Sequence, residues 1–342
     1  MKKLNFTKIM AVCLALFMLA GCQEENNVEP RQDVSLKDMM ATLETFDKTL
    51  TYNIYKAEGD LKGDFTSRRW RQKLTRWATE SKTPTFYTLM IALKDARINW
   101  FVENNEVTVL APTDDAFFAL GITPENVDMI PNLREILLYH VLEGTITSSD
   151  LSDGYATTLN EASVKVSLED GVFFNQAEVI SADNFTDNGV IHVIDQVIFP
   201  PTLLDIVDGN ENFSILKTAI ETAGLESALE DPDAALTVFA PTDAAFLSVL
   251  EELELTPADL LGSPDLSTIL LYHVFGGEVF STDLADGLTV DMLAGGSIEF
   301  DLESMPPSII DGQGRVVPLN TGLLDIRATN GVVHVVDRVL LP

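Results

Sequence analysis

The stretch Asn188–Pro200, NGVIHVIDQVIFP, returns almost unchanged as Asn330–Pro342, NGVVHVVDRVLLP. Two further pairs of stretches recur in the same order: Thr108–Phe118 with Thr237–Leu247, and Ile136–Gly144 with Ile269–Gly277. The separation between the copies grows along the chain, so the second copy carries short insertions between its blocks. An ordered repeat of this length indicates duplication of a whole domain and not a solenoid of small units.

The extent of each copy follows from a weaker match upstream. Phe86–Ile98 aligns with Phe213–Leu225. The first copy is therefore expected over residues 83–200 and the second over residues 201–342. Two consecutive prolines stand at the junction, which predicts a stiff connection because proline restricts the backbone.

Local patterns predict how each copy begins and ends. Val107–Leu110 is a short apolar run that a proline ends, and Thr113 behind it is a natural N-cap for a helix over residues 116–120. Thr123 and its counterpart Thr256 each precede a proline, which predicts a further helix start. The closing run Val190–Phe199 is apolar and β-branched and predicts a central strand.

The middle of each copy predicts a buried segment and paired strands. Leu133–Val141 is expected to be a buried helix or strand that enters a Tyr-His pair. Residues 163–179 alternate between apolar and polar, with a hairpin turn expected at Glu169–Gly171. Asp311–Gly314 is expected to be the equivalent turn in the second copy.

The order of these blocks resembles the fasciclin domain family, twice over. The motifs that carry the resemblance are APTD-x-AF, then LLYHV with a glycine two residues on, then NGV-x-HV-x-D-x-V-x-x-P, and they span about 260 of the 342 residues. The resemblance implies an α+β fold of two tandem domains, each a twisted β-wedge packed with helices. It also implies a non-enzymatic module for extracellular adhesion or matrix interaction.

The charge of the chain limits its partners. It has 53 Asp and Glu against 22 Lys and Arg, a formal net charge of -31. A surface of this sign repels the phosphates of nucleic acid, so nucleic acid is excluded as a partner. The same surface attracts cations or basic partners.

The N-terminus resembles the signal of a bacterial lipoprotein. Lys2 and Lys3 precede the apolar run Ile9–Ala20, and a lipobox-like LAGC ends at Cys22. Residues 1–21 are therefore expected to be a signal peptide and Cys22 the lipidation site that anchors the chain to a membrane. An ordinary secretory signal with an incidental cysteine is the alternative. Cys13 is the one other cysteine, which excludes disulfides and thiolate metal sites from the repeats.

Residues 22–82 are expected to form a tether and an N-terminal helical segment. Gln23, Glu24 and Glu25 resemble the acidic signals that place some lipoproteins on the outer face of the outer membrane, with the periplasmic face as the alternative. The basic cluster Arg68–Trp77 puts Trp70, Leu74 and Trp77 on one helical face. That helix is expected either to dock on the first domain, with its arginines meeting acidic groups, or to lie on the membrane surface.

All four histidines of the chain lie in the repeated blocks: His140, His192, His273 and His334. Metal binding requires further ligands at suitable spacing, and none is present, so no metal site is expected. A structural role is favoured, in which each histidine bonds backbone groups or a nearby Asp or Thr.

The same structural network is expected to include four further polar residues. The fasciclin resemblance implies links between Thr113 and His140 and between Thr242 and His273. Asp195 and Asp337 lie inside apolar runs, and as buried carboxylates they would have to be paired.

The Tyr-His pairs have a second interpretation. In animal members of the fasciclin family this pair has been implicated in integrin-type adhesion. The resemblance therefore makes Tyr139, His140, Tyr272 and His273 a candidate adhesion motif, provided that they reach the surface.

The sequence contains no G-x-S-x-G, P-loop, G-x-G-x-x-G or H-E-x-x-H motif, so neither an enzyme nor a cofactor is expected. The predicted function is a lipid-anchored, cell-surface envelope protein that binds a protein or glycan through its tandem domains. The alternatives are a structural accessory subunit of an outer-membrane complex and a hydrolase that uses His and Asp.

Overall fold

The computed structural model describes residues 71–72, 75 and 85–342. The predicted signal peptide, Cys22 and most of the segment Arg68–Trp77 lie outside the described residues. In the described part, no helix has both the length and the apolar character needed to cross a membrane.

The first repeat builds a single seven-stranded sheet in the order β2-β1-β7-β6-β5-β4-β3. Its strands are β1 (Val107–Pro112), β2 (Val141–Glu143), β3 (Gly154–Thr157), β4 (Ser163–Ser167), β5 (Phe173–Phe174), β6 (Ala177–Thr186) and β7 (Gly189–Ile194). Its helices are α4 (Tyr87–Asp95), α5 (Asn99–Asn104), α6 (Asp114–Ala119), the short 3-10 helix η1 (Val127–Met129) and α7 (Leu133–Tyr139). Strand β7 pairs with β1 in parallel and with β6 antiparallel, which confirms the predicted central strand. It ends at Ile194, five residues before the predicted Phe199.

The second repeat divides the same strands between two sheets, β14-β15-β8-β9 and β10-β11-β12-β13. Its strands are β8 (Leu236–Pro241), β9 (Val274–Phe275), β10 (Thr289–Asp291), β11 (Ser297–Asp301), β12 (Ser308–Ile310), β13 (Val316–Pro318), β14 (Ile326–Ala328) and β15 (Gly331–Val336). Its helices are α8 (Leu203–Asp208), α9 (Ser214–Ala223), α10 (Glu226–Glu230), α11 (Asp243–Glu252), α12 (Pro257–Leu261) and α13 (Leu266–Leu271), with 3-10 turns η2 (Glu211–Phe213) and η3 (Ser281–Asp283). The counterpart of β6 is interrupted between β13 and β14.

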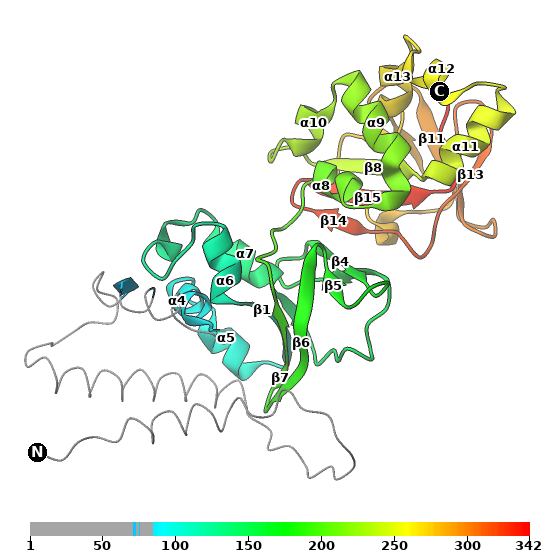
Figure 1. The fold of residues 1–342 in the computed structure, drawn as a ribbon. Coiled ribbons are helices and arrows are strands. Elements are labelled where there is room, and N and C mark those ends of the chain that lie inside the picture. The colour runs from blue at the N-terminus through cyan, green and yellow to red at the C-terminus, as the bar shows by residue number, and fades with distance from the viewer. Residues whose placement is uncertain (1–70, 73–74, 76–84) are drawn as a thin grey trace, which may run out of the picture. The chain divides into compact units, whose positions relative to one another are not determined.

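Each repeat buries its sheet on both faces. In β1, Val109 packs into a cluster formed with the helices, while the next residue, Leu110, packs into a cluster formed with the hairpins. In β8, Val238 and Phe239 divide in the same way. Because successive side chains of a strand point to opposite faces, the helices cover one face and the hairpins the other (Figure 1). This is the α+β architecture that the resemblance implied.

The predicted helix starts have mixed outcomes. Thr113 and Thr242 accept a hydrogen bond from the N3 backbone N–H of α6 and α11, which confirms Thr113 as an N-cap. Thr256 caps α12 and makes a reciprocal capping box with Asp259. The prediction of a helix start at Thr123 is wrong, because this segment forms only turns and η1.

The difference between Thr123 and Thr256 follows from the residue three positions on. Asn126 replaces the capping aspartate, and its amide donates to Gly121 O at 2.9 Å. The side chain therefore ties the turn back to the preceding loop, and the N3 backbone N–H of the turn bonds the carbonyl oxygen of Thr123 instead of its hydroxyl.

The predicted equivalence of two hairpin turns is wrong. Residues 168–172 join β4 to β5, whereas Asp311–Gly314 lies between β12 and β13, the counterparts of β5 and β6. In the first repeat that second position is a tight turn at Asn175 and Gln176. A glycine turn can close any hairpin, so its presence alone did not identify which hairpin it closes.

Candidate functional site

Both Tyr-His pairs lie inside the protein. Tyr139 and His140 have exposed fractions of 0% and 1%, and Tyr272 and His273 have 0% and 2%. Each pair ends a helix, α7 or α13, and leads into the short strand β2 or β9. A side chain with no exposed surface cannot touch a partner directly, so these four residues do not form a surface adhesion site in this conformation.

His140 joins two distant segments of the first repeat. Its Nδ1 lies 2.7 Å from Ile136 O, and its Nε2 accepts a hydrogen bond from Ile198 N at 3.1 Å. A nitrogen that accepts from a backbone N–H carries no proton, so the ring is neutral with its proton on Nδ1. Burial lowers the pKa of His140 to about 4, which keeps the ring neutral at pH 7.

His273 repeats this arrangement in the second repeat. Its Nδ1 lies 2.8 Å from Ile269 O, and its Nε2 accepts from Leu340 N at 2.9 Å. Burial lowers the pKa of His273 to about 4 as well. The implied links from Thr113 to His140 and from Thr242 to His273 are therefore wrong, because both nitrogens of each ring are taken by backbone groups.

His192 and His334 use the opposite tautomer. Their Nε2 atoms lie 2.9 Å and 2.8 Å from the carbonyl oxygens of Ile146 and Val279. Their Nδ1 atoms accept from backbone N–H groups at 3.3 Å and 3.2 Å, so the proton is on Nε2. Burial lowers the pKa of His334.

The N–H donors to these two rings belong to Asp183 and Asp325, which sequence reasoning missed. Each has a left-handed backbone, with φ of 56°. The carboxylate of Asp183 accepts from Ser148 N at 2.7 Å and Ser148 Oγ at 2.5 Å, and Ser281 bonds Asp325 in the same way. The available signal was that each aspartate precedes its histidine by nine residues.

These contacts leave no ring nitrogen of the four histidines without a hydrogen-bond partner. All eight ring nitrogens are occupied, so no ring is available as a metal ligand or as an acid–base group without breaking a hydrogen bond. Within residues 71–72, 75 and 85–342, no three His, Cys, Asp or Glu side chains converge in a way that would hold a metal ion.

The expected burial of two carboxylates is wrong for Asp337 and only partly right for Asp195. Asp337 is exposed and meets Asn320 at 3.4 Å. Asp195 is half-buried and accepts from Glu178 N at 2.7 Å. Strands β7 and β15 end at the residue before each aspartate, so the carboxylates leave the apolar run and reach solvent.

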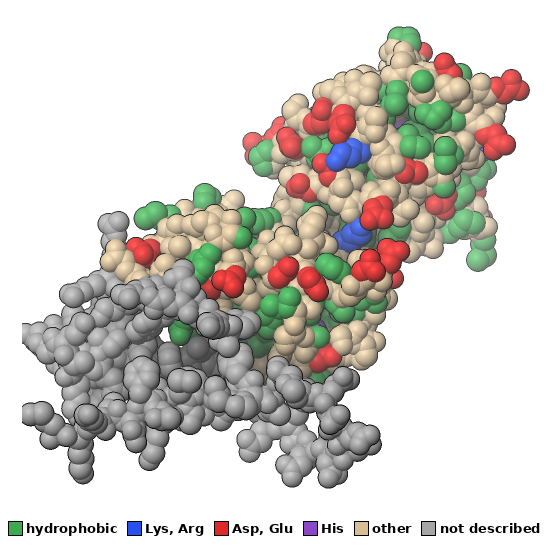
Figure 2. All heavy atoms as spheres, viewed as in Figure 1, with side chains coloured by type: hydrophobic (Ala, Val, Ile, Leu, Met, Phe, Trp, Pro, Cys, Tyr) green, Lys and Arg blue, Asp and Glu red, His purple; other side chains and the backbone are tan. Residues whose placement is uncertain are grey.

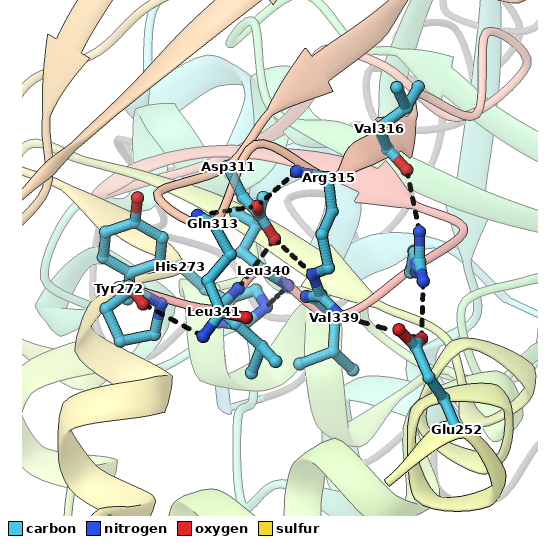
Figure 3. A network of polar contacts seen from close by, with 12 residues as sticks. Glu252, Tyr272, His273, Asp311, Gln313, Arg315, Val316, Val339, Leu340 and Leu341 are labelled. Atoms are coloured by element: carbon cyan, nitrogen blue, oxygen red, sulfur yellow. Dashed lines mark hydrogen bonds and ion pairs between the residues drawn. The ribbon is translucent and has the colours of Figure 1, made fainter.

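The second repeat contains a charged network that the first lacks (Figure 3). Asp311, with a fully buried side chain, pairs with Arg315 at 2.8 Å and accepts from Leu341 N at 3.2 Å. Arg315 also donates to Val339 O at 2.7 Å. The turn between β12 and β13 thus fastens residues 339–341 to the sheet. Glu252 lies beside it and pairs with Arg338.

Arg71 attaches part of the N-terminal segment to the first repeat. Its guanidinium lies 2.9 Å from Asp95 and 3.2 Å from Asp128, and it donates to Pro124 O at 3.2 Å. The side chain is only 7% exposed. One arginine of the basic cluster therefore meets acidic groups of the first repeat, as one of the two sequence interpretations expected.

The exterior carries most of the charge. Carboxylates are spread over the visible face of both repeats with few basic side chains among them (Figure 2). The four histidines and both tyrosines of the Tyr-His pairs lie inside, so their side chains are not part of this acidic exterior.

Residues 84–200 and 211–342 each match the Fasciclin domain. This chain belongs to the Fasciclin domain family. A protein of Synechocystis, sll1483, is 44% identical over 126 residues, which cover 34% of this chain and 68% of that protein. Transforming growth factor-beta-induced protein ig-h3 from pig (Sus scrofa) is 27% identical over 249 residues, 69% of this chain.

The family relationship does not extend to the whole of the larger relatives. The chain spans about a third (34%) of the length of pig ig-h3. Among solved structures, the Fasciclin domain pair of the insect cell adhesion molecule fasciclin I is 20% identical and covers 75% of this chain, with a TM-score of 0.44.

Proposed function

We propose that the chain is a lipid-anchored protein of the bacterial cell envelope that binds a protein or glycan partner through its two Fasciclin domains. Membership of the family is consistent with adhesion or binding. The observation that carries the proposal is the burial of both tyrosines of the Tyr-His pairs and of all four histidines. The four histidines and both Tyr-His pairs hold the fold together, so recognition falls to the exterior. The proposal includes no catalytic activity.

Duplication supports binding by a physical argument. Two linked domains raise the apparent affinity for a repetitive or surface-bound partner, because the second contact becomes intramolecular. An anchor at Cys22 would add the same advantage by holding the chain at a membrane.

The binding proposal is tested with the whole chain. Saturable binding to one or more members of a panel of extracellular matrix proteins and envelope glycans is expected. Binding to no member of the panel, together with no protein that co-purifies in mild detergent, would contradict it.

The placement is tested on intact cells. Cys22→Ser is expected to abolish incorporation of labelled fatty acid and to release the chain from the membrane fraction. Added protease is expected to cleave the wild-type chain at the cell surface. Full protection of an anchored chain would place it in the periplasm instead.

A second candidate function is supported by the Arg71 contact. Arg71, held by Asp95 and Asp128 of the first repeat, gives an envelope complex a fixed point of attachment. In that case, deletion of residues 66–80 removes co-purifying subunits and leaves panel binding unchanged. Loss of panel binding with retained subunits would favour the first function.

A further inference from the structure

A hollow of about 550 Å³ is lined by residues of both repeats and of the junction between them. The first repeat contributes the start of α7 and the turn between β3 and β4, and the second contributes the loop after β9 and the turn between β14 and β15. This volume lies in the range of ordinary ligand sites and accommodates one or two side chains of a partner.

Polar contacts between the two repeats support the walls of this hollow. Arg327 N donates to Ser163 Oγ at 2.9 Å. Nearby, Lys165 Nζ donates to Gly209 O at 2.8 Å, and Asn210 Nδ2 lies 3.4 Å from the Tyr155 hydroxyl. The Tyr155 ring packs against the core of the second repeat. Arg327, which lines the hollow, is therefore fixed to the first repeat through its backbone.

The hollow already holds one guanidinium group. The Arg327 side chain lies 4.3 Å from the centre of the Phe280 ring, and its Nη1 is 3.3 Å from a carboxylate oxygen of Glu161. A cation that lies over a ring face and beside a carboxylate is stabilised by the cation–π interaction and by the charged hydrogen bond. The lining thus stabilises a guanidinium cation through an aromatic ring and a carboxylate.

The parts for a second cation are also present. Glu135 and Glu278 line the hollow, are exposed, and form no ion pair with any other residue that the structure describes. Phe199, also in the lining, is 45% exposed. Three carboxylates face one guanidinium, so the hollow has a net negative charge, and its apolar walls concentrate the field.

We propose that this hollow binds an arginine or lysine side chain on a segment of a partner protein. The cation pairs with Glu135 and Glu278, and its aliphatic stem or an apolar neighbour packs on Phe199. A neutral glycan would leave both carboxylates without a counter-charge, so a basic protein segment is favoured. This inference rests on the proposed binding function and gives the partner its chemistry.

The test uses the whole chain and a short labelled peptide of alternating leucine and arginine. Fluorescence anisotropy is expected to show saturable binding that weakens with salt. In the double variant Glu135→Gln, Glu278→Gln, affinity is expected to fall by about tenfold or more, as for close interfacial charge pairs. Phe199→Ala is expected to weaken binding by a smaller factor.

The matched control is Glu143→Gln, Glu299→Gln, which removes two exposed strand carboxylates away from the hollow. It is expected to change affinity by less than about twofold, because distant surface charges are screened. An equal loss in both double variants, or no binding of the peptide by the wild-type chain, would overturn the inference. Binding of a neutral chito-oligosaccharide that depends on Phe199 but on neither carboxylate would also overturn it, in favour of a glycan.

The same variants separate this inference from the proposed function. A panel member that binds the wild-type chain and the hollow double variant equally would refute the hollow while the binding function stands. Failure of the wild-type chain to bind any panel member, the peptide or a co-purifying protein would remove both.

Discussion

The two repeats close the same fold in different ways. In the first, a tight turn places Asn175 so that its amide donates to the Tyr139 hydroxyl at 3.0 Å. In the second, the longer turn at Asp311–Gly314 brings the Gly312 backbone to the Tyr272 hydroxyl instead, and Asp311 pairs with Arg315. The tyrosine hydroxyls nevertheless donate to equivalent carbonyl oxygens, at Ser163 and Ser297. The inner contacts are therefore retained while the turn above them varies.

The largest effect is expected at the ion pair that only the second repeat has. Arg315→Ala leaves the buried Asp311 carboxylate without its cation, which should cost about 3–5 kcal/mol. The loss of unfolding free energy should be confined to the second repeat. Hydrogen exchange measured across a urea titration follows each repeat separately. Arg338→Ala, whose side chain is 29% exposed, is the control and should cost less than about 1 kcal/mol. Equal losses in the two variants would show that burial of the pair is unimportant.

A smaller but symmetrical effect is expected from the Tyr-His histidines. His140→Ala and His273→Ala each leave a buried backbone N–H unpaired, that of Ile198 or of Leu340, at a cost of about 1–3 kcal/mol. Each variant should destabilise its own repeat, measured by the same method. A large difference between the two costs would show that the histidines do not act alike.

Acid should weaken both repeats through these histidines. Burial lowers the pKa of each to about 4 in the folded chain, from the ordinary histidine value of 6.5. As pH falls, the histidine is therefore protonated in the unfolded chain before it is protonated in the folded chain. The stability that comes from the neutral, buried ring is fully present above pH 6.5 and is lost as pH falls. Between pH 6.5 and 5, each repeat should lose about 1.5 kcal/mol from its Tyr-His histidine. Urea unfolding at constant salt measures this. A flat profile over that window would contradict the neutral, buried assignment.

The smallest effect is expected from the contact of Arg71 with the first repeat. Aligned positions of the second repeat hold Thr222 and Leu261 in place of Asp95 and Asp128. Arg71→Ala should destabilise the first repeat by about 1 kcal/mol, because the carboxylates it leaves are partly solvated. Gln72→Ala, at an exposed neighbour, should have no measurable effect in thermal unfolding. Equal shifts in both variants would rule out a specific Arg71 contact.

Local features of the fold were predictable from the sequence. Thr113 is followed by its helix because a hydroxyl cap acts within three residues, and β7 was visible in its β-branched run. The wrong prediction at Thr123 shows how far local patterns can be used. There, Asn126 stands in place of the capping aspartate, and its side chain bonds Gly121 O in the preceding loop.

The sequence predicted that the internal polar network exists, but not which residues bond each other in it. The sequence indicated that the histidines are structural, but His140 bonds Ile198, 58 residues away, and His273 bonds Leu340, 67 residues away. Partners at such distances depend on tertiary packing and leave no local pattern. Asp183 was missed because its contact with His192 uses its backbone N–H, which any residue type offers.

The parallel pairing of β1 with β7 has a consequence for how each repeat forms. Val107 lies beside Gly189, with almost the whole domain between them, and Ile198 must arrive before His140 is satisfied. Contacts between such distant residues slow folding, because a long loop has to close first. The first repeat therefore stays incomplete until nearly all of it is free to fold. Until then its apolar strands are substrates for chaperones.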